Sequence, residues 1–118
     1  VWTSLTAGPF GDLLSAEELG RIGKRVAAAG VERVLVNCVA ASRMQSYVDA
    51  IVGVGCPTGV YANAGRKDEG LGWGAVKEEA VERYAELAER WVDAGVTVIG
   101  GCCGTGPLHV TALAERFG

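Results

Sequence analysis

The sequence lacks long apolar runs and lacks an excess of positive charge. No run reaches the length of about 18 apolar residues that marks a transmembrane helix, so no segment is expected to cross a membrane. Eleven Lys and Arg residues stand against 14 Asp and Glu residues, a net charge of −3, and this balance argues against a surface that binds nucleic acid. The first residues contain no basic segment and do not resemble a secretory signal. We therefore expect a cytoplasmic protein.

Other signals of known function classes are also missing. No Gly-x-Gly-x-x-Gly motif follows the first predicted strand, so a dinucleotide-binding fold has no direct support. The composition, with 49% apolar and 21% charged residues, argues against a disordered tail or a coiled coil. The only histidine, His109, lies in the first turn of the last predicted helix. We expect it to pack or to form hydrogen bonds there, rather than to be a fourth metal ligand.

Short apolar strands alternate with glycine-rich loops and amphipathic helices along all 118 residues. Strands are predicted at residues 1–6, 33–37, 58–62 and 96–99. Helices are predicted at residues 15–29, 42–53, 76–94 and 107–118. This alternation predicts an α/β fold of four βα units with parallel strands. Since four units are half of a (β/α)8 TIM-type barrel, residues 1–118 are expected to be a single partial domain, completed by a missing half or by self-association.

Four cysteines carry the clearest chemical signal in the chain. Cys38 directly follows the second predicted strand, and Cys102 and Cys103 follow the fourth. Ligands bind at the carboxyl ends of parallel strands, and in a barrel these two ends can converge at the mouth. Cys56 lies at a helix-to-strand turn at the opposite end and is expected to be structural. Without an export signal, metal binding or redox chemistry is favoured over a disulfide scaffold.

The adjacent pair Cys102 and Cys103 needs an irregular backbone to serve one ion, because neighbours on a strand point to opposite faces. Gly100, Gly101 and Gly104 supply the required freedom. Three thiolates with an open fourth position are typical of a catalytic zinc rather than a closed structural one. The alternative is that the pair are small buried apolar residues in a tight turn.

Three motifs resemble the homocysteine S-methyltransferase family. Residues 91–105 (WVDAGVTVIGGCCGT) resemble its closing signature, residues 36–38 (VNC) its central Val-Asn-Cys motif, and residues 60–65 (VYANAG) its Tyr-Pro-Asn-Ser/Ala-Gly motif. They occur in the family's order and cover nearly the whole chain. The resemblance implies a (β/α)8 barrel, of which this chain is the C-terminal half.

The resemblance also implies an activity and a site. It implies that Zn²⁺ is bound by Cys38, Cys102 and Cys103. It implies substrate-binding roles for Asn37, Tyr61, Asn63 and Gly65. The reaction implied is transfer of a methyl group from a small donor to the thiol of homocysteine, giving methionine, as a step of methionine biosynthesis. The sequence leaves the identity of the donor open.

The chain departs from the family pattern in a few places. Ala62 stands where the family usually has Pro, and Leu108 where it usually has an acidic residue. The family's N-terminal Asp-Gly motif and the acidic residue of its middle strands, which help to hold the amino acid, have no counterpart. This chain alone is therefore expected to lack part of the substrate site.

Three alternatives remain open at this point. The glycine-rich loop 100–106 before a helix is also typical of a phosphate site in a barrel half. A non-catalytic half-barrel with a structural zinc would use the same cysteines. Cys102 and Cys103 could instead be a reversible redox pair. Two neighbouring residues have candidate roles as well: Thr105 as the cap of the last helix, and Trp73 as a cover of the site mouth or as plain packing.

Overall fold

The structure of the protein is a computed structural model that describes residues 1–73 and 77–118. The strands are β1 (Trp2–Leu5), β2 (Arg33–Ala40), β3 (Thr58–Asn63) and β4 (Val98–Gly101). The helices are α1 (Ala16–Ala28), α2 (Met44–Ile51), α3 (Lys77–Ala94) and α4 (Pro107–Phe117). Two short 3-10 turns occur at Ala41–Arg43 and Lys67–Glu69.

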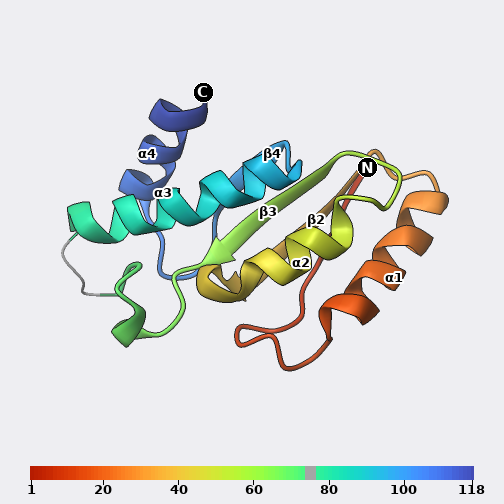
Figure 1. The fold of residues 1–118 in the computed structure, drawn as a ribbon, viewed down its shortest axis with the longest axis horizontal. Coiled ribbons are helices and arrows are strands. Elements are labelled where there is room, and N and C mark those ends of the chain that lie inside the picture. The colour runs from red at the N-terminus through yellow and green to blue at the C-terminus, as the bar shows by residue number, and fades with distance from the viewer. Residues whose placement is uncertain (74–76) are drawn as a thin grey trace.

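The four strands form one parallel sheet in the order β1-β2-β3-β4. Val36 of β2 pairs with Leu5 of β1 on one side and with Val60 of β3 on the other. Figure 1 shows α1, α2 and α3 lying across the sheet. The predicted α/β fold of four βα units with parallel strands is confirmed.

One face of the sheet is buried beneath the helices. Val34, Val36 and Val60 have no exposed surface, and burial of such apolar surface is the main force that holds the layers together. The same core includes Leu19 of α1, Met44, Val48 and Ile51 of α2, and Tyr84, Ala88 and Trp91 of α3. The other face lines an open hollow bordered by Trp2, Ser4, Leu35, Tyr61, Val98 and Gly100.

Three strands end later than the sequence analysis predicts: β2 at Ala40, β3 at Asn63 and β4 at Gly101. β4 begins at Val98 rather than at residue 96, because the N–H of Val96 donates to the carbonyl of Trp91 (3.1 Å) and so closes the end of α3. β2 continues to Ala40 rather than ending at residue 37. It does so by passing through an irregularity, a shift of register on β3 between Asn37 and Ala40.

Local sequence signals explain the start of α1 but not that of α2. A capping box starts α1: Ser15 Oγ accepts from the N–H of Glu18 (3.1 Å), and a Glu18 carboxylate oxygen accepts from the N–H of Ser15 (3.0 Å). α2 begins at Met44 rather than residue 42, because Ala41–Arg43 form a 3-10 turn first. The predicted start of the third helix at residue 76 lies outside the described residues.

Tyr84 fastens α3 to the carboxyl ends of two strands. Its side chain is fully buried against Trp91, with ring centroids 5.7 Å apart in an edge-to-face arrangement. Its hydroxyl lies 2.8 Å from the carbonyls of both Ala62 and Gly100. Burial raises the pKa of the Tyr84 phenol well above its ordinary value, so the group stays a neutral hydrogen-bond donor. A side chain of α3 therefore holds the ends of β3 and β4, close to Cys102 and Cys103.

The two outer strands, β1 and β4, are the edges of the sheet. Within residues 1–73 and 77–118 no further strand pairs with either of them, so their outer backbone groups lack sheet partners. No helix in this part of the chain is both long enough and apolar enough to cross a membrane.

Candidate metal centre

The structure brings three cysteines together at the carboxyl ends of the strands. Cys38 lies in β2, and Cys102 and Cys103 follow β4 directly. Their sulfur atoms all lie within 4.8 Å of one another, although 64 positions separate Cys38 from Cys102. Cys56 is apart from this cluster and is a free, half-buried cysteine. The structure thus brings together the cysteines that follow the second and fourth strands, as expected for the carboxyl ends of parallel strands.

The bonding within the cluster differs from the alternatives weighed for the sequence. Cys38 and Cys102 are joined by a disulfide, and Cys103 is a free, exposed thiol. Cys102 and Cys103 are not bonded to each other in this structure, and their sulfurs lie 4.0 Å apart. This disulfide joins two of the three predicted metal ligands, Cys38 and Cys102. Because metals bind thiolates, an ion could occupy only the reduced cluster.

The three sulfurs could hold a metal ion once they are reduced. Sulfurs at tetrahedral positions about 2.3 Å from zinc lie about 3.8 Å apart, which is close to the 4.0 Å between the sulfurs of Cys102 and Cys103. No fourth His, Cys, Asp or Glu joins the three cysteines in the part of the chain that the structure describes. The described residues therefore offer a metal ion three sulfur ligands.

Backbone hydrogen bonds fix the loop that carries Cys102 and Cys103 to the end of β3. The N–H of Cys102 donates to the carbonyl of Ala62 (2.9 Å), and the N–H of Ala64 donates to the carbonyl of Cys103 (2.8 Å). The hydroxyl of Thr105 donates to the carbonyl of Cys102 (2.7 Å). The expectation that Thr105 caps α4 is therefore wrong: the N-cap is the next residue, and the hydroxyl closes the cysteine turn instead.

Asn37 and Tyr61 lie on the open face of the sheet and are joined through Ser4. The Tyr61 hydroxyl donates to Ser4 Oγ (2.8 Å), which donates to Asn37 Oδ1 (2.9 Å). Asn37 directly precedes Cys38 in the chain. Ser4 was not among the residues expected from the sequence. The signal that could have found it is its place in the first strand, where alternation sets its side chain on the same face as that of Trp2.

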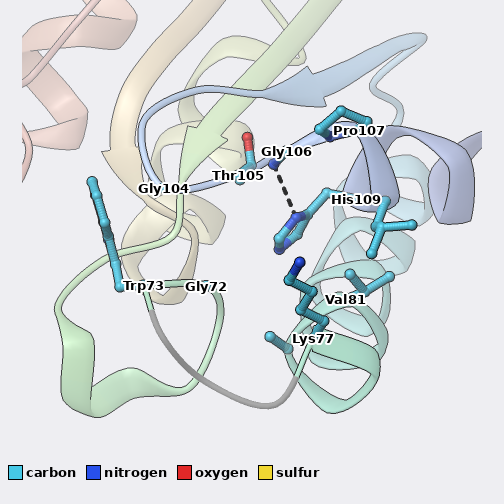
Figure 2. A pocket seen from close by; sticks show the side chains of 11 residues that line it. Gly72, Trp73, Lys77, Val81, Gly104, Thr105, Gly106, Pro107 and His109 are labelled. Carbon is cyan, nitrogen blue, oxygen red and sulfur yellow. Dashed lines mark hydrogen bonds between the residues drawn. The ribbon is translucent and has the colours of Figure 1, made fainter.

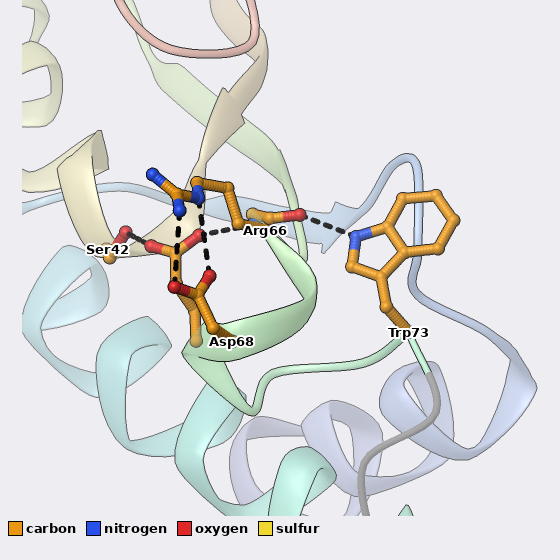
Figure 3. Close-up of polar contacts among 6 residues, drawn as sticks. Ser42, Arg66, Asp68 and Trp73 are labelled. Carbon is orange, nitrogen blue, oxygen red and sulfur yellow. Dashed lines mark hydrogen bonds and ion pairs between the residues drawn. The ribbon is translucent and has the colours of Figure 1, made fainter.

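Asn63 and Gly65 make their contacts inside the protein. Asn63 is 5% exposed, its Nδ2 donates to the carbonyl of Cys38 (2.8 Å), and its Oδ1 accepts from the N–H of Gly65 (2.8 Å). Gly65 has a φ of +72°, and its carbonyl accepts from the indole N–H of Trp73 (2.6 Å). Figure 3 shows the Trp73 ring directed at this carbonyl. In this structure both residues hold loops around the cysteines.

The same loop is tied down at a second point. The Glu69 carboxylate accepts hydrogen bonds from the Ser42 hydroxyl and from the backbone N–H of Arg66. The Arg66 guanidinium in turn pairs with Asp68 (3.3 Å), as Figure 3 shows. These contacts involve exposed side chains, and such pairs contribute little to stability. The bond from Trp73 to Gly65 is a further attachment of the same loop.

His109 is buried and uses both ring nitrogens on backbone groups. Its Nδ1 accepts from the N–H of Gly106 (3.1 Å), the bond drawn in Figure 2, and its Nε2 lies 2.7 Å from the carbonyl of Leu71. An acceptor at Nδ1 and a carbonyl at Nε2 fit the neutral ring with its proton on Nε2. The expected hydrogen-bonding role is confirmed. His109 lies outside the cysteine cluster.

Replacing His109 by Leu is expected to lower the free energy of unfolding by about 1–3 kcal/mol, because the buried carbonyl of Leu71 loses its donor. Glutamine at the same position has both a donor and an acceptor, and at the third position of a helix it can accept from the N-cap N–H. His109→Gln should therefore lose less. Denaturant unfolding of both variants tests this, and equal losses would contradict it.

The profile of the family described as Homocysteine S-methyltransferase matches residues 1–117. The chain belongs to this family. It is 32% identical over 97 residues to the selenocysteine Se-methyltransferase of Brassica oleracea var. italica, a match that covers 80% of this chain and 27% of that protein. It is 36% identical over 61 residues to homocysteine S-methyltransferase 3 of Arabidopsis thaliana, which covers 50% and 18%.

Solved structures of the homocysteine methyltransferase MmuM from Escherichia coli share the fold. The metallated form matches with a TM-score of 0.64 and 25% identity, over 86% of this chain and 32% of that one. The oxidized form matches with a TM-score of 0.60 and 28% identity, over 79% and 29%. MmuM is a TIM-barrel methyltransferase, so the chain corresponds to a fragment of such a barrel. It spans about a third or less of the length of each of these relatives.

Proposed function

We propose that the protein containing this chain transfers a methyl group to the thiol of homocysteine, with zinc held by Cys38, Cys102 and Cys103. The observation that carries the proposal is the cluster of three sulfurs within 4.8 Å with no fourth ligand among the described residues. Membership of the homocysteine S-methyltransferase family supports the substrate and the reaction. Because the ligands must be reduced, the protein would act in a reducing compartment such as the cytoplasm.

The chemical problem is the weak nucleophilicity of a protonated thiol. With a pKa near 8.5, only a few per cent of an alkyl thiol is ionised at neutral pH. Zinc, when bound, would stabilise the thiolate of homocysteine at the open position and so supply the nucleophile. A bond then forms between this sulfur and the methyl carbon, while the bond from the donor to that carbon breaks and its electrons remain on the donor. The thiol proton passes to solvent.

The described residues fit a reaction that needs no side-chain base at the sulfur. The only histidine has both ring nitrogens occupied by backbone groups, and no carboxylate joins the cysteines in residues 1–73 and 77–118. The contribution of the chain is to hold the three sulfurs and to present polar groups beside them, since correct placement of two reactants supplies much of a rate enhancement. Ser4 and Tyr61 border the hollow in which a substrate would lie, and Asn37 is hydrogen-bonded to Ser4 beside it.

The zinc content of the complete protein tests this proposal directly. We expect about one zinc per chain under reducing conditions, and its loss in a Cys102→Ser/Cys103→Ser double variant. Cys56→Ser, in a cysteine outside the cluster, is the matched control and should keep its zinc. The X-ray absorption of zinc should gain a further sulfur neighbour when homocysteine is added.

Each other outcome points to one of the alternatives. Zinc that does not respond to homocysteine indicates a structural site in a non-catalytic module. Absence of zinc in a folded, reduced protein contradicts the proposal and favours the anion-binding or redox interpretation. Adding selenocysteine in a parallel sample distinguishes the two acceptors, because one relative is named for methylation of selenium.

A further inference from the structure

Cys38 has an unusual backbone conformation for a residue in a strand. Its φ is +56°, and Cys38 and Trp73 alone have positive φ among the non-glycine residues that the structure describes. Side chains with a Cβ atom disfavour this left-handed region, so surrounding contacts must hold a residue that occupies it. The same position lies where β2 shifts its register on β3, between Asn37 and Ala40.

This conformation matters for where the Cys38 sulfur lies. Successive side chains of a regular strand point to opposite faces, and Asn37 directs its side chain to Ser4 on the open face. Continued alternation would send Cys38 toward the opposite, helix-covered face. The left-handed turn breaks this alternation, and the sulfur instead meets Cys102 and Cys103.

Asn63 is placed to hold this turn. It is 5% exposed, and its Nδ2 donates to the carbonyl of Cys38 (2.8 Å). Its Oδ1 accepts from the N–H of Gly65 (2.8 Å), which fixes the orientation of the amide, because a flipped amide would direct its oxygen at the Cys38 carbonyl and its nitrogen at the Gly65 N–H. Only a side chain with both a donor and an acceptor can make this pair of bonds.

The backbone on either side of Asn63 holds the other two cysteines. Ala62 accepts from the N–H of Cys102 and Ala64 donates to the carbonyl of Cys103. The end of β3 therefore contacts all three cysteines, and it reaches Cys38 through the Asn63 side chain. We propose that Asn63 is a positioning residue, whose hydrogen bond to the Cys38 carbonyl sets the Cys38 sulfur within the thiolate cluster. The inference rests on the proposed function for its role in metal binding.

The decisive variant is Asn63→Asp, which keeps the size and the acceptor for Gly65 but has no donor for Cys38 when ionised. Asn63→Ser is a second variant: its hydroxyl can still accept in a turn of this kind, but the side chain is one atom shorter and does not reach the Cys38 carbonyl while it does so. We expect each to lower zinc affinity about 10- to 100-fold, the usual effect of removing a group that supports a metal ligand. Tyr47→Phe, which removes the hydroxyl that donates to the carbonyls of Gly11 and Leu14 and lies outside the cysteine cluster, is the matched control and should not change the affinity.

Two readouts separate positioning from a general loss of stability. With Co²⁺ as the probe, the sulfur-to-cobalt absorption per bound ion should fall from the intensity of three thiolates toward that of two. Saturating metal reports only folded, loaded molecules, so partial unfolding does not imitate this result. In the reduced, metal-free protein, the Cys38–Cys102 disulfide should form more slowly in both Asn63 variants than in the control, as measured by mass spectrometry of trapped peptides.

The outcomes for the two proposals can be told apart. If the unaltered protein shows three-thiolate cobalt absorption and both Asn63 variants match it, with unchanged disulfide rates, the role of Asn63 is wrong and the metal site stands. If the unaltered protein binds neither zinc nor cobalt, the proposed function is wrong, and the disulfide rates alone decide whether Asn63 positions Cys38.

Discussion

Serine in place of any one of Cys38, Cys102 or Cys103 is expected to reduce methyl transfer to homocysteine at pH 7 by at least about 30-fold. This lower limit follows from ionisation alone, because a thiol with a pKa near 8.5 is about 3% thiolate at that pH. The described residues offer no fourth side-chain ligand. Loss of one sulfur should therefore also weaken the binding of the zinc that would hold the homocysteine thiolate in place. The measurement is kcat/KM in the complete protein with each single variant.

The dependence on pH gives a second test of the same variants. Residual transfer in the Cys variants should rise about tenfold for each pH unit below the pKa of free homocysteine thiol, since only the deprotonated form attacks. The unaltered protein should show a flatter profile in this range. Cys56→Ser is the control, because Cys56 lies outside the cluster, and it should keep the original rate and profile. Full activity in any one of the three cluster variants would show that three ligands are not required.

The number and role of the sulfur ligands separate the proposed methyltransferase from a structural zinc site and from an anion site. A structural zinc is held by four protein ligands, whereas the described residues offer three sulfurs. An anion site at the start of α4 would leave the cysteines without a role, and their replacement would then have little effect on binding of phosphate. The Cys38–Cys102 disulfide brings these two sulfurs into direct contact. Ligands of one metal ion must also lie close together, so the position of these sulfurs agrees with a metal site in the reduced protein.

The periodicity of the sequence was sufficient to predict the layers of the fold and the meeting of the cysteines. Buried apolar segments at the second and third strands indicate parallel pairing, and parallel pairing places Cys38 and Cys102 at one edge of the sheet. The hydrogen bond from the N–H of Gly106 to His109 also follows from the place of His109 in the first turn of α4. These features depend on local pattern and topology alone.

Other features depend on contacts between distant segments and could not be predicted in this way. The role of Ser4 depends on register, which sets it near Tyr61, 57 positions along the chain. The clamp between Asn63 and Cys38 depends on a left-handed backbone that non-glycine residues rarely adopt. Thr105 has the composition of a helix cap, but the carbonyl of Cys102 in the preceding turn competes for its hydroxyl.

Replacing Gly104 by Ala is expected to lower the free energy of unfolding by about 2–5 kcal/mol. Gly104 has a φ of +79°, a conformation that costs a residue with a Cβ atom about 1–2 kcal/mol. The added methyl group would meet the indole ring of Trp73 and lie 2.8 Å from the Cβ of the fully buried Ala64, and overpacking of this kind costs about 1–3 kcal/mol. Denaturant unfolding of the complete protein measures the sum.

The same change should also displace Cys103, since Gly104 follows it directly and Ala64 holds the Cys103 carbonyl. Zinc affinity is therefore expected to fall together with stability. Gly106→Ala is the matched control two positions further on: its φ is −146° and an added Cβ meets nothing within 4 Å, so its cost should stay below about 1 kcal/mol, the range for an altered N-cap. Equal losses in the two variants would mean that the close packing of Trp73, Gly104 and Ala64 does not hold the cysteine loop in place.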